Sequence, residues 1–149
     1  MLRPEGRVRP FRGGRYGLEL MPENELSILL SEMRPEKRPG RFVFVELPEE
    51  GIPGVEMPAT VHEPEGVSAV LKEADADRHG LSYDFVAGWI TLRVESSLSA
   101  VGLTAAVSSC LSEEGISCNV IAGLHHDHLL VPIERVDEAV RALEDLAAG

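Results

Sequence analysis

Hydrophobic and polar positions alternate most regularly between residues 88 and 132, where they predict a strand, a helix and a two-stranded hairpin. Residues 89–94 alternate large apolar with polar side chains and are rich in β-branched residues, as in a half-buried strand. After a serine-rich loop at 95–100, apolar residues recur at helical spacing and predict one buried helix face. That face consists of Leu103, Ala106, Val107, Cys110 and Leu111. Gly115 then predicts the helix end, because glycine readily adopts the left-handed conformation found there.

The pattern after Gly115 predicts two more strands and a last helix. Residues 116–122 are expected to form the first strand, Gly123 begins a turn, and residues 128–131 return as the second strand. Residues 134–148 are amphipathic, with an apolar face of Val136, Ala139, Val140, Leu143 and Leu146. The order β-α-β-β-α is a split βαβ arrangement, which predicts an antiparallel sheet with both helices on one face.

The first half of the chain predicts a short helix followed by three strands. The helix is expected over residues 24–33, because Pro35 and Pro39 prevent its continuation. The strands are expected over residues 41–47, 59–62 and 67–71, with a proline- and glycine-rich loop over 48–58 and a short helix within 72–80.

Composition excludes several classes of function. The 149 residues carry a net charge of −11, which argues against nucleic acid as a partner, because phosphates attract basic surfaces. No apolar run reaches membrane-spanning length, and no signal peptide is recognisable. Cys110 and Cys118 fall on a helix face and a strand, so we expect two packing residues in a reducing cytoplasm and no disulfide.

Residues 1–20 differ in charge from the rest of the chain. They contain five arginines and two glutamates, a net charge of +3, whereas residues 21–149 hold nine basic and 23 acidic residues, a net charge of −14. Two interpretations remain open: a basic arm for an acidic partner, or a segment outside the natural chain, with Met21 as the true start. Under either interpretation we expect residues 1–20 to be disordered.

The segment His125-His126-Asp127-His128 offers zinc ligands and groups for acid–base chemistry. In an extended chain, however, His126 and His128 share one side and Asp127 faces the other. The remaining two histidines lack the spacing of metal ligands, so too few ligands converge for a zinc site. We therefore predict no metal site and interpret the segment as a polar hairpin at the mouth of the sheet.

Gly102 stands where the serine-rich loop enters the helix, and two interpretations of it remain open. Without a Cβ, it lets a ligand approach the backbone, and the N–H groups at the start of the helix attract a carboxylate. Alternatively, the glycine only permits close packing of the helix on the sheet.

No pattern in the sequence indicates catalysis. Ser96, Ser97 and Ser99 lack the G-x-S-x-G setting, and neither cysteine has a histidine beside it. A phosphate-binding loop and a dinucleotide motif are also absent from the sequence. We therefore expect no catalytic residue and no cofactor.

Two segments of the sequence resemble a known family. The longer one, residues 96–132, reads SSLSAVGLTAAVSSCLSEEGISCNVIAGLHHDHLLVP. It is similar to SSLEAVGLTAA followed by GISCNVVAGYYHDHIFVP in small bacterial proteins with two tandem ACT domains. Residues 60–66 resemble the T-F-x-E-x-E-G segment of the same proteins, and together the similarity extends over residues 23–146.

The resemblance implies an α+β fold of two ACT-like subdomains, each ferredoxin-like with a split βαβ order, an antiparallel sheet and helices on one face. We expect these subdomains over residues 21–84 and 85–149. A complete ACT unit is βαββαβ, and the second half of this chain lacks a strand after its last helix. We therefore expect the first half to donate the missing edge strand, because an open edge is a liability.

The resemblance also implies a function, because ACT domains generally bind amino acids or other small effectors and regulate a partner. The loop around Gly102 and the strand at 117–119 would form two walls of the site, with the hairpin facing the ligand. The N–H groups of residues 102–104 would meet an α-carboxylate, and Asp127 or Asn119 would meet the α-ammonium. The expected ligand-binding residues are Ser97, Val101, Gly102, Leu103, Thr104, Cys118, Asn119, His126 and Asp127.

The sequence thus predicts a cytoplasmic, non-catalytic, regulatory module that binds a small molecule. Two other functions remain open. One is a protein-interaction or oligomerisation module with a vestigial effector pocket, and the other is a metal-dependent enzyme that uses the histidine hairpin. A homodimer is expected, with a contact face on the strand at 89–94 or on the two helices.

Overall fold

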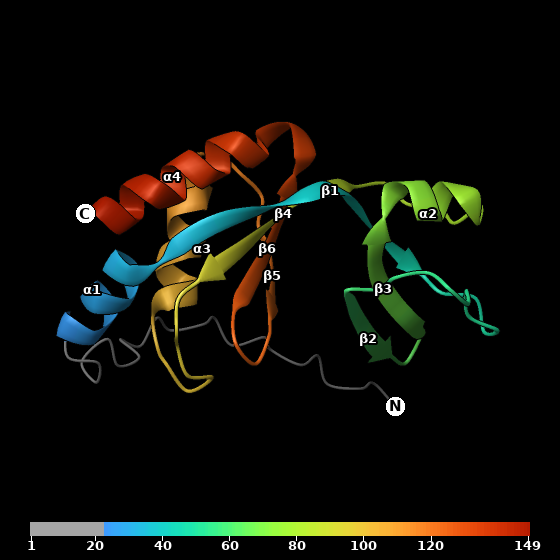
Figure 1. Cartoon of the computed structure of the whole chain (residues 1–149), viewed down its shortest axis with the longest axis horizontal. Coiled ribbons are helices and arrows are strands. Elements are labelled where there is room, and N and C mark those ends of the chain that lie inside the picture. Colours follow the sequence, from blue (N-terminus) through green and yellow to red (C-terminus); the bar gives the residue numbers. More distant parts are fainter. Residues whose placement is uncertain (1–22) are drawn as a thin grey trace, which may run out of the picture.

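The computed structural model describes residues 23–149, in which six antiparallel strands form a curved sheet in the order β2-β3-β1-β4-β6-β5 (Figure 1). The elements are α1 (Glu23–Glu32), β1 (Arg34–Glu46), β2 (Ala59–Glu63), β3 (Gly66–Lys72), α2 (Glu73–Arg78), β4 (Val86–Arg93), α3 (Leu103–Glu113), β5 (Asn119–Ala122), β6 (Asp127–Pro132), the 3-10 turn η1 (Ile133–Arg135) and α4 (Val136–Ala148). The expectations for residues 1–20 and Met21 lie outside the described residues.

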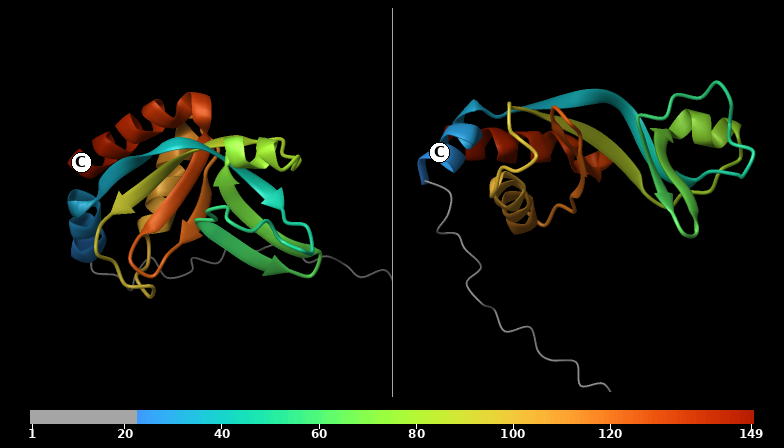
Figure 2. Two further views of the ribbon diagram at one scale, coloured as in Figure 1. Left: turned by 45° about the vertical axis from the view of Figure 1, so that its right-hand side comes forward. Right: turned by 90° about the horizontal axis from the view of Figure 1, so that it is seen from below.

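Strands β1 and β4 are long, and each takes part in two units of the fold (Figure 2). Residues 42–46 of β1 pair with β3, whereas residues 34–38 pair with residues 89–93 of β4. One unit therefore has the strand order β2-β3-β1-β4, and the other has the equivalent order β5-β6-β4-β1. The expected donation of an edge strand by the first half of the chain is confirmed.

The length of β1 differs from the sequence prediction, which placed its start at residue 41. Pro35 and Pro39 end the preceding helix as expected, but they lie inside the strand. Among the described strands, residues 34–38 pair only with β4, so a proline there breaks no ladder on the other side. Gly40, with a φ of 118°, lies where the pairing with β4 shifts register between Arg38 and Phe42.

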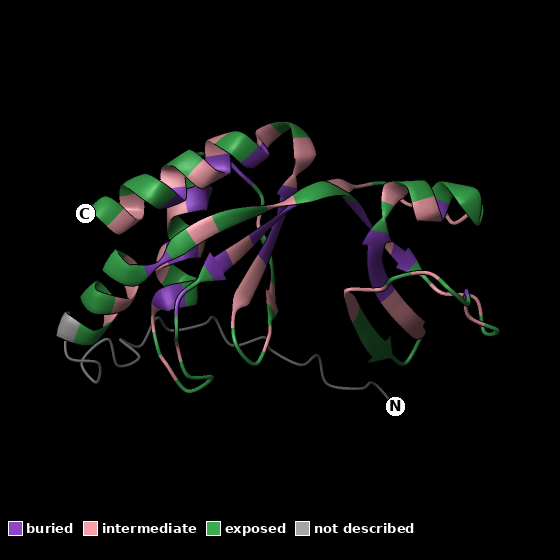
Figure 3. Cartoon of the chain, in the orientation of Figure 1, coloured by how far each residue is buried: buried purple, intermediate pink, exposed green. Residues whose placement is uncertain are grey.

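All helices that the structure describes pack on the same face of the sheet, as the alternation of side chains requires. Val43, Val45 and Val86 face α2, and Ile90 and Leu92 face the other three helices. The buried residues accordingly form stripes along the inner strands (Figure 3). The predicted buried faces of α3 and α4 are confirmed by Leu103, Val107 and Leu111 in α3 and by Val136, Ala139 and Leu143 in α4.

The face of the sheet without helices carries a smaller aromatic cluster. Phe42 and Trp89 meet edge to face with ring centroids 5.2 Å apart. The guanidinium of Arg38 lies 5.0 Å from the centroid of the Trp89 ring and 3.1 Å from Glu56, which belongs to the loop after β1. The loop therefore positions a cation over the aromatic rings, and Trp89 is only 2% exposed.

The strand predicted to form a dimer face lies in the interior of the sheet. β4 is flanked by β1 on one side and β6 on the other. The edges of the described sheet are β2 and β5. Backbone pairing already occupies both sides of this strand, so residues 89–94 cannot pair edge to edge with a second copy, and a dimer contact through their face stays a prediction.

Gly88 is the place where β4 approaches the start of α4 most closely. A Cβ at Gly88 would lie 2.6 Å from Cγ2 of Val136 and 2.7 Å from its Cβ. We expect Gly88→Ala to lower the free energy of unfolding by about 1–3 kcal/mol through overpacking. Urea unfolding would measure the loss. The double variant Gly88→Ala/Val136→Ala should lose less free energy of unfolding than the two single variants lose in sum. Strict additivity of the two losses would contradict the steric explanation.

Candidate functional site

Three cavities meet around the loop that joins β4 to α3. The inner cavity, of about 110 Å³, lies between this loop, the first turn of α3 and the β5–β6 turn. An outer cavity of about 400 Å³ continues from it along Glu95, Leu124 and His125. A third, the α1 cavity, of about 430 Å³, lies between the loop and helix α1. Ser96 and Ser97 line all three cavities, so the cavities lie next to one another around this loop.

The inner cavity is lined by both acceptors and donors of hydrogen bonds. Ser97 and Thr104 contribute hydroxyl groups, and Asp127 contributes a carboxylate. His126 also lines it, and its Nδ1 atom is buried without a hydrogen-bond partner among the described residues.

The start of α3 supplies further donors. Gly102 is the N-cap residue, and no side chain caps the helix. The first intrahelical bond runs from the Ala106 N–H to the Gly102 carbonyl, at 2.9 Å. The amides of residues 103–105 therefore lack partners within the helix. Leu103 and Thr104 line the inner cavity, so the start of α3, where free amides favour an anion, borders this cavity.

The structure explains Gly102 by backbone conformation and packing. Its φ of 105° lies in the region that favours glycine, and a Cβ would come within 3.2 Å of Leu26 on α1. It does not line any of the three cavities. The geometry thus favours the packing interpretation, although the packing partner is helix α1 and not the sheet.

Of the nine expected site residues, five line the inner cavity: Ser97, Leu103, Thr104, His126 and Asp127. The other four do not. Val101 is 58% exposed beside Gly102, Cys118 packs against the main core, and Asn119 is exposed at the start of β5. Whether the five bind a ligand stays a prediction.

Six more residues of the loop and the β5–β6 turn line the inner cavity but were not among the expected ligand-binding residues: Ser96, Leu98, Ala100, Ala122, Gly123 and His125. The only sequence feature that indicated these residues was the short β5–β6 turn, because a short turn between two paired strands lies beside the loop of the neighbouring strand. The sequence predicted that His126 and Asp127 point to opposite sides of an extended chain. The strand begins only at Asp127, however, and both residues line the inner cavity.

His128 belongs to the helix-free face of the sheet. The indole N–H of Trp89 donates to its Nδ1 at 3.2 Å, and the Thr91 hydroxyl lies 3.1 Å from the same atom. Because an indole nitrogen only donates, we infer that Nδ1 accepts and that the neutral ring carries its proton on Nε2. Burial lowers the pKa of His128, and the charges of His126 and Arg38 lower it further, against the opposite effect of Asp127.

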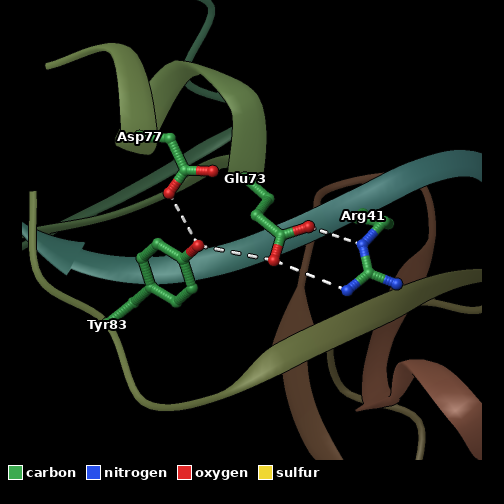
Figure 4. Close-up of polar contacts among 4 residues, drawn as sticks. All are labelled: Arg41, Glu73, Asp77 and Tyr83. Atoms are coloured by element: carbon green, nitrogen blue, oxygen red, sulfur yellow. Dashed lines mark hydrogen bonds and ion pairs between the residues drawn. The ribbon is translucent and has the colours of Figure 1, made fainter. Parts of the chain in front are cut away.

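A second polar cluster lies at the other end of the molecule, where α2 meets β1 (Figure 4). The Tyr83 hydroxyl donates to Asp77 at 2.7 Å, and Glu73 lies 3.4 Å from it. Arg41 holds Glu73 through an ion pair of 2.5 Å, which lowers the pKa of that carboxyl. The hydrogen bond to Asp77 and burial raise the pKa of Tyr83 to about 12. None of the three cavities described above is lined by these residues, and their ion pair and hydrogen bonds tie α2 to the sheet.

The described residues 23–149 contain neither a metal-binding cluster nor a membrane-spanning helix. No group of three or more His, Cys, Asp or Glu side chains is arranged to hold a metal ion within this range. None of the helices in the same range is long and apolar enough to cross a membrane. Both described cysteines are free, and burial raises the pKa of each thiol.

Comparisons with known proteins identify the family. Models of the ACT domain match residues 21–88 and 84–145. The structure is similar to a Vibrio cholerae protein of unknown function, described as a possible transport protein, with 41% identity, a TM-score of 0.75 and coverage of 83% of this chain and 97% of that one. No curated protein sequence matches this chain significantly.

More distant structures share the fold alone. A protein from Agrobacterium tumefaciens is 21% identical, with a TM-score of 0.58 over 78% of this chain and 90% of that one. The regulatory subunit of aspartate kinase from Thermus thermophilus is 9% identical, with a TM-score of 0.57 over 75% of this chain and 95% of that one.

The chain belongs to the ACT-domain family, and it carries two ACT domains in tandem. The expected α+β, ferredoxin-like fold with antiparallel strands is confirmed. ACT domains are regulatory modules, so the family supports a regulatory, ligand-binding function for this chain.

His128 predicts a loss of stability on acidification. Its pKa in the folded chain lies below the usual 6.5, so the unfolded chain binds the proton more readily. The contribution of the neutral His128 to the free energy of unfolding is therefore complete above that usual pKa. It declines as the pH falls through the lower pKa of the folded chain. His128→Gln keeps an acceptor for Trp89 and should show a shallower decline between about pH 7 and pH 5. Urea unfolding across this range checks it, with His79→Gln, at an exposed site, as control. Parallel curves for wild type and His128→Gln would contradict the assignment.

Tyr83 should ionise only at strongly alkaline pH. We expect the phenolate absorbance that is lost in Tyr83→Phe to appear with a pKa of about 12. Asp77→Asn removes the charged acceptor, which is the largest cause of the shift, and should move the transition toward the usual value of 10. An unchanged transition in Asp77→Asn would show that another group raises the pKa. Asp84→Asn, an exposed change nearby in sequence, serves as the control.

Proposed function

We propose that this chain is a non-catalytic regulatory module that binds an amino acid in the inner cavity. One observation carries the proposal: Leu103 and Thr104, at the uncapped start of α3, and Asp127 line the same small cavity. These groups complement the two charges that every free amino acid carries. The tandem ACT domains support a regulatory function in general, and the amino acid is our addition.

The binding mode follows from the charges of the two walls. The α-carboxylate would accept hydrogen bonds from the amides of residues 103–105, where the helix dipole is also favourable. The α-ammonium would donate to Asp127 on the β5–β6 turn. The hydroxyl groups of Ser97 and Thr104 and the ring of His126, which also line the cavity, would complete the site. The ligand side chain would enter the outer cavity, whose volume of about 400 Å³ is typical of small-molecule sites.

We further propose a cytoplasmic homodimer with domain boundaries near residue 85. Two free cysteines suit a reducing compartment. The edge strand β5 presents unpaired backbone groups and the 37% exposed Val120, which favour pairing with a second copy. The same edge supports the alternative function, an oligomerisation module in which the cavities bind nothing.

A thermal-shift screen of the whole chain against the amino acids tests this proposal. A ligand at one hundred times its dissociation constant should stabilise the fold by about 2.7 kcal/mol. Asp127→Asn, which keeps the shape and removes the charge, should weaken binding at least tenfold, or about 1.4 kcal/mol. The matched control Asp84→Asn changes an exposed carboxylate on the other unit and should bind normally. No stabilisation by any amino acid, together with a dimer in sedimentation, would favour the oligomerisation module.

A further inference from the structure

We propose that His128 is a proton-dependent positioning residue for the inner cavity, whose neutral ring holds the β5–β6 turn in place and whose protonated ring releases it. His128 lines none of the three cavities. It acts on the inner cavity through the residues that it touches, which belong to β4 on one side of the ring and to the turn on the other.

The neutral ring is bonded to β4 on the helix-free face of the sheet. Its Nδ1 atom accepts the indole N–H of Trp89 at 3.2 Å and lies 3.1 Å from the Thr91 hydroxyl. The indole and imidazole rings meet edge to face, with centroids 5.4 Å apart. Thr91 is also the direct partner of His128 in the pairing of β4 with β6. Strand pairing and side-chain contacts thus hold the ring against β4.

The other edge of the ring lies against the β5–β6 turn. A Cβ at Gly123 would come within 3.2 Å of Nε2 and 3.6 Å of Cδ2 of His128. The same Cβ would lie 2.8 Å from the carbonyl oxygen of His126, which accepts the Gly123 N–H at 2.9 Å. Gly123 lines the inner cavity together with Ala122 and Asp127. The ring of His128 therefore joins the wall of this cavity to β4.

Protonation of His128 turns one of these contacts from attractive to repulsive. An imidazolium carries an N–H on both nitrogens, and the indole nitrogen of Trp89 cannot accept a hydrogen bond. Nδ1 and the indole nitrogen would then be two donors facing each other, whereas the Thr91 hydroxyl can accept instead of donate. The ring must move away from the indole. Because its other edge touches Gly123, this movement displaces the turn.

Charged side chains near the ring determine the pH at which the turn is released. They come from the turn, from β6, from β1 and from the loop after β1: His126, Asp127, Arg38 and Glu56, which pairs with Arg38 at 3.1 Å. Farther along the same face, Glu36 of β1 and Arg93 of β4 pair with each other at 3.4 Å. The residues opposite His128 on β4 and β5 are the uncharged Thr91 and Ile121. Burial lowers the pKa of His128 and the charges of His126 and Arg38 lower it further, so the release belongs to weakly acidic solution.

The effect on ligand binding rests on the proposed amino-acid site. A ligand shifts an equilibrium only by its difference in affinity between two states. An amino acid that binds to the ordered turn therefore favours neutral His128, and its binding weakens as the pH falls. The position of the turn itself depends on no ligand, so it can be measured on the protein alone.

Proton–nitrogen NMR of the whole chain between about pH 8 and pH 5 tests this inference. Trp89 is the only tryptophan of the chain, so its indole N–H gives a single signal. We expect this signal to shift as His128 titrates, with a midpoint below 6.5. The protection of the Gly123 amide from hydrogen exchange, corrected for the intrinsic effect of pH, should fall about fivefold, as for the loss of one hydrogen bond.

Three variants separate the proton on His128 from other effects of pH. His128→Gln keeps an acceptor for the indole N–H but does not titrate, so the signal of Trp89 and the protection of Gly123 should both become independent of pH in this range. His126→Gln removes a charge that lowers the pKa of His128, and it should raise the midpoint of the indole shift. His79→Gln, at an exposed position on the other unit, should behave like the wild type.

Two results would overturn the inference. An indole signal that stays constant, or that shifts equally in His128→Gln, would show that the proton on His128 does not break the contact with Trp89. An indole signal that shifts while the protection of Gly123 stays constant would show that the turn is not released. Both results leave the proposed amino-acid binding intact, because the thermal-shift screen tests it separately.

Discussion

The antiparallel pairing of β1 with β4 is the interaction on which the rest of the structure depends. Both strands contribute to two units, so their pairing joins the two units into one six-stranded sheet. Neither half of the chain contains a full set of strands for one unit. Stability of the second unit therefore requires residues 34–38 from the first half, and stability of the first requires the start of β4. Loss of this pairing would expose the edges of both units.

The same pairing positions the cavities. β4 lies between β1 and β6, so the loop that leaves its end at Val94 passes directly beside the turn that begins β6. Helix α1, which precedes β1, packs against α3 and α4 and forms one wall of the α1 cavity. Three segments that are distant in sequence thus meet at one end of the molecule. The site consists of loops, but paired strands and a packed helix hold each loop at its ends.

Sequence periodicity was sufficient for α3, β6 and α4, because each has one clear apolar face. It failed for the start of β1, since Pro35 and Pro39 normally argue against a strand and are tolerated only where one edge is unpaired. For the site, five residues were identified from the family motif and the helix start. Gly102 was expected in the site from the same motif, but it lines none of the cavities, and its contact with Leu26 on α1 could not be predicted because that helix is far away in sequence. The contributions of Ser96 and His125 depend likewise on which loops become neighbours, and no local pattern records this.

Shared strands also determine how binding at one end would affect the other. A ligand shifts an equilibrium only by its difference in affinity between two states. Here the folded second unit includes the β1–β4 ladder, and the folded first unit requires the same ladder. Ligand binding that stabilises the second unit against local opening therefore stabilises part of the first. Trp89 reinforces this link, because it packs on Phe42 of β1 and hydrogen-bonds to His128 of β6, the strand that carries Asp127. Coupling of this kind needs no large movement, since the two units have a strand pair in common and not merely a contact surface.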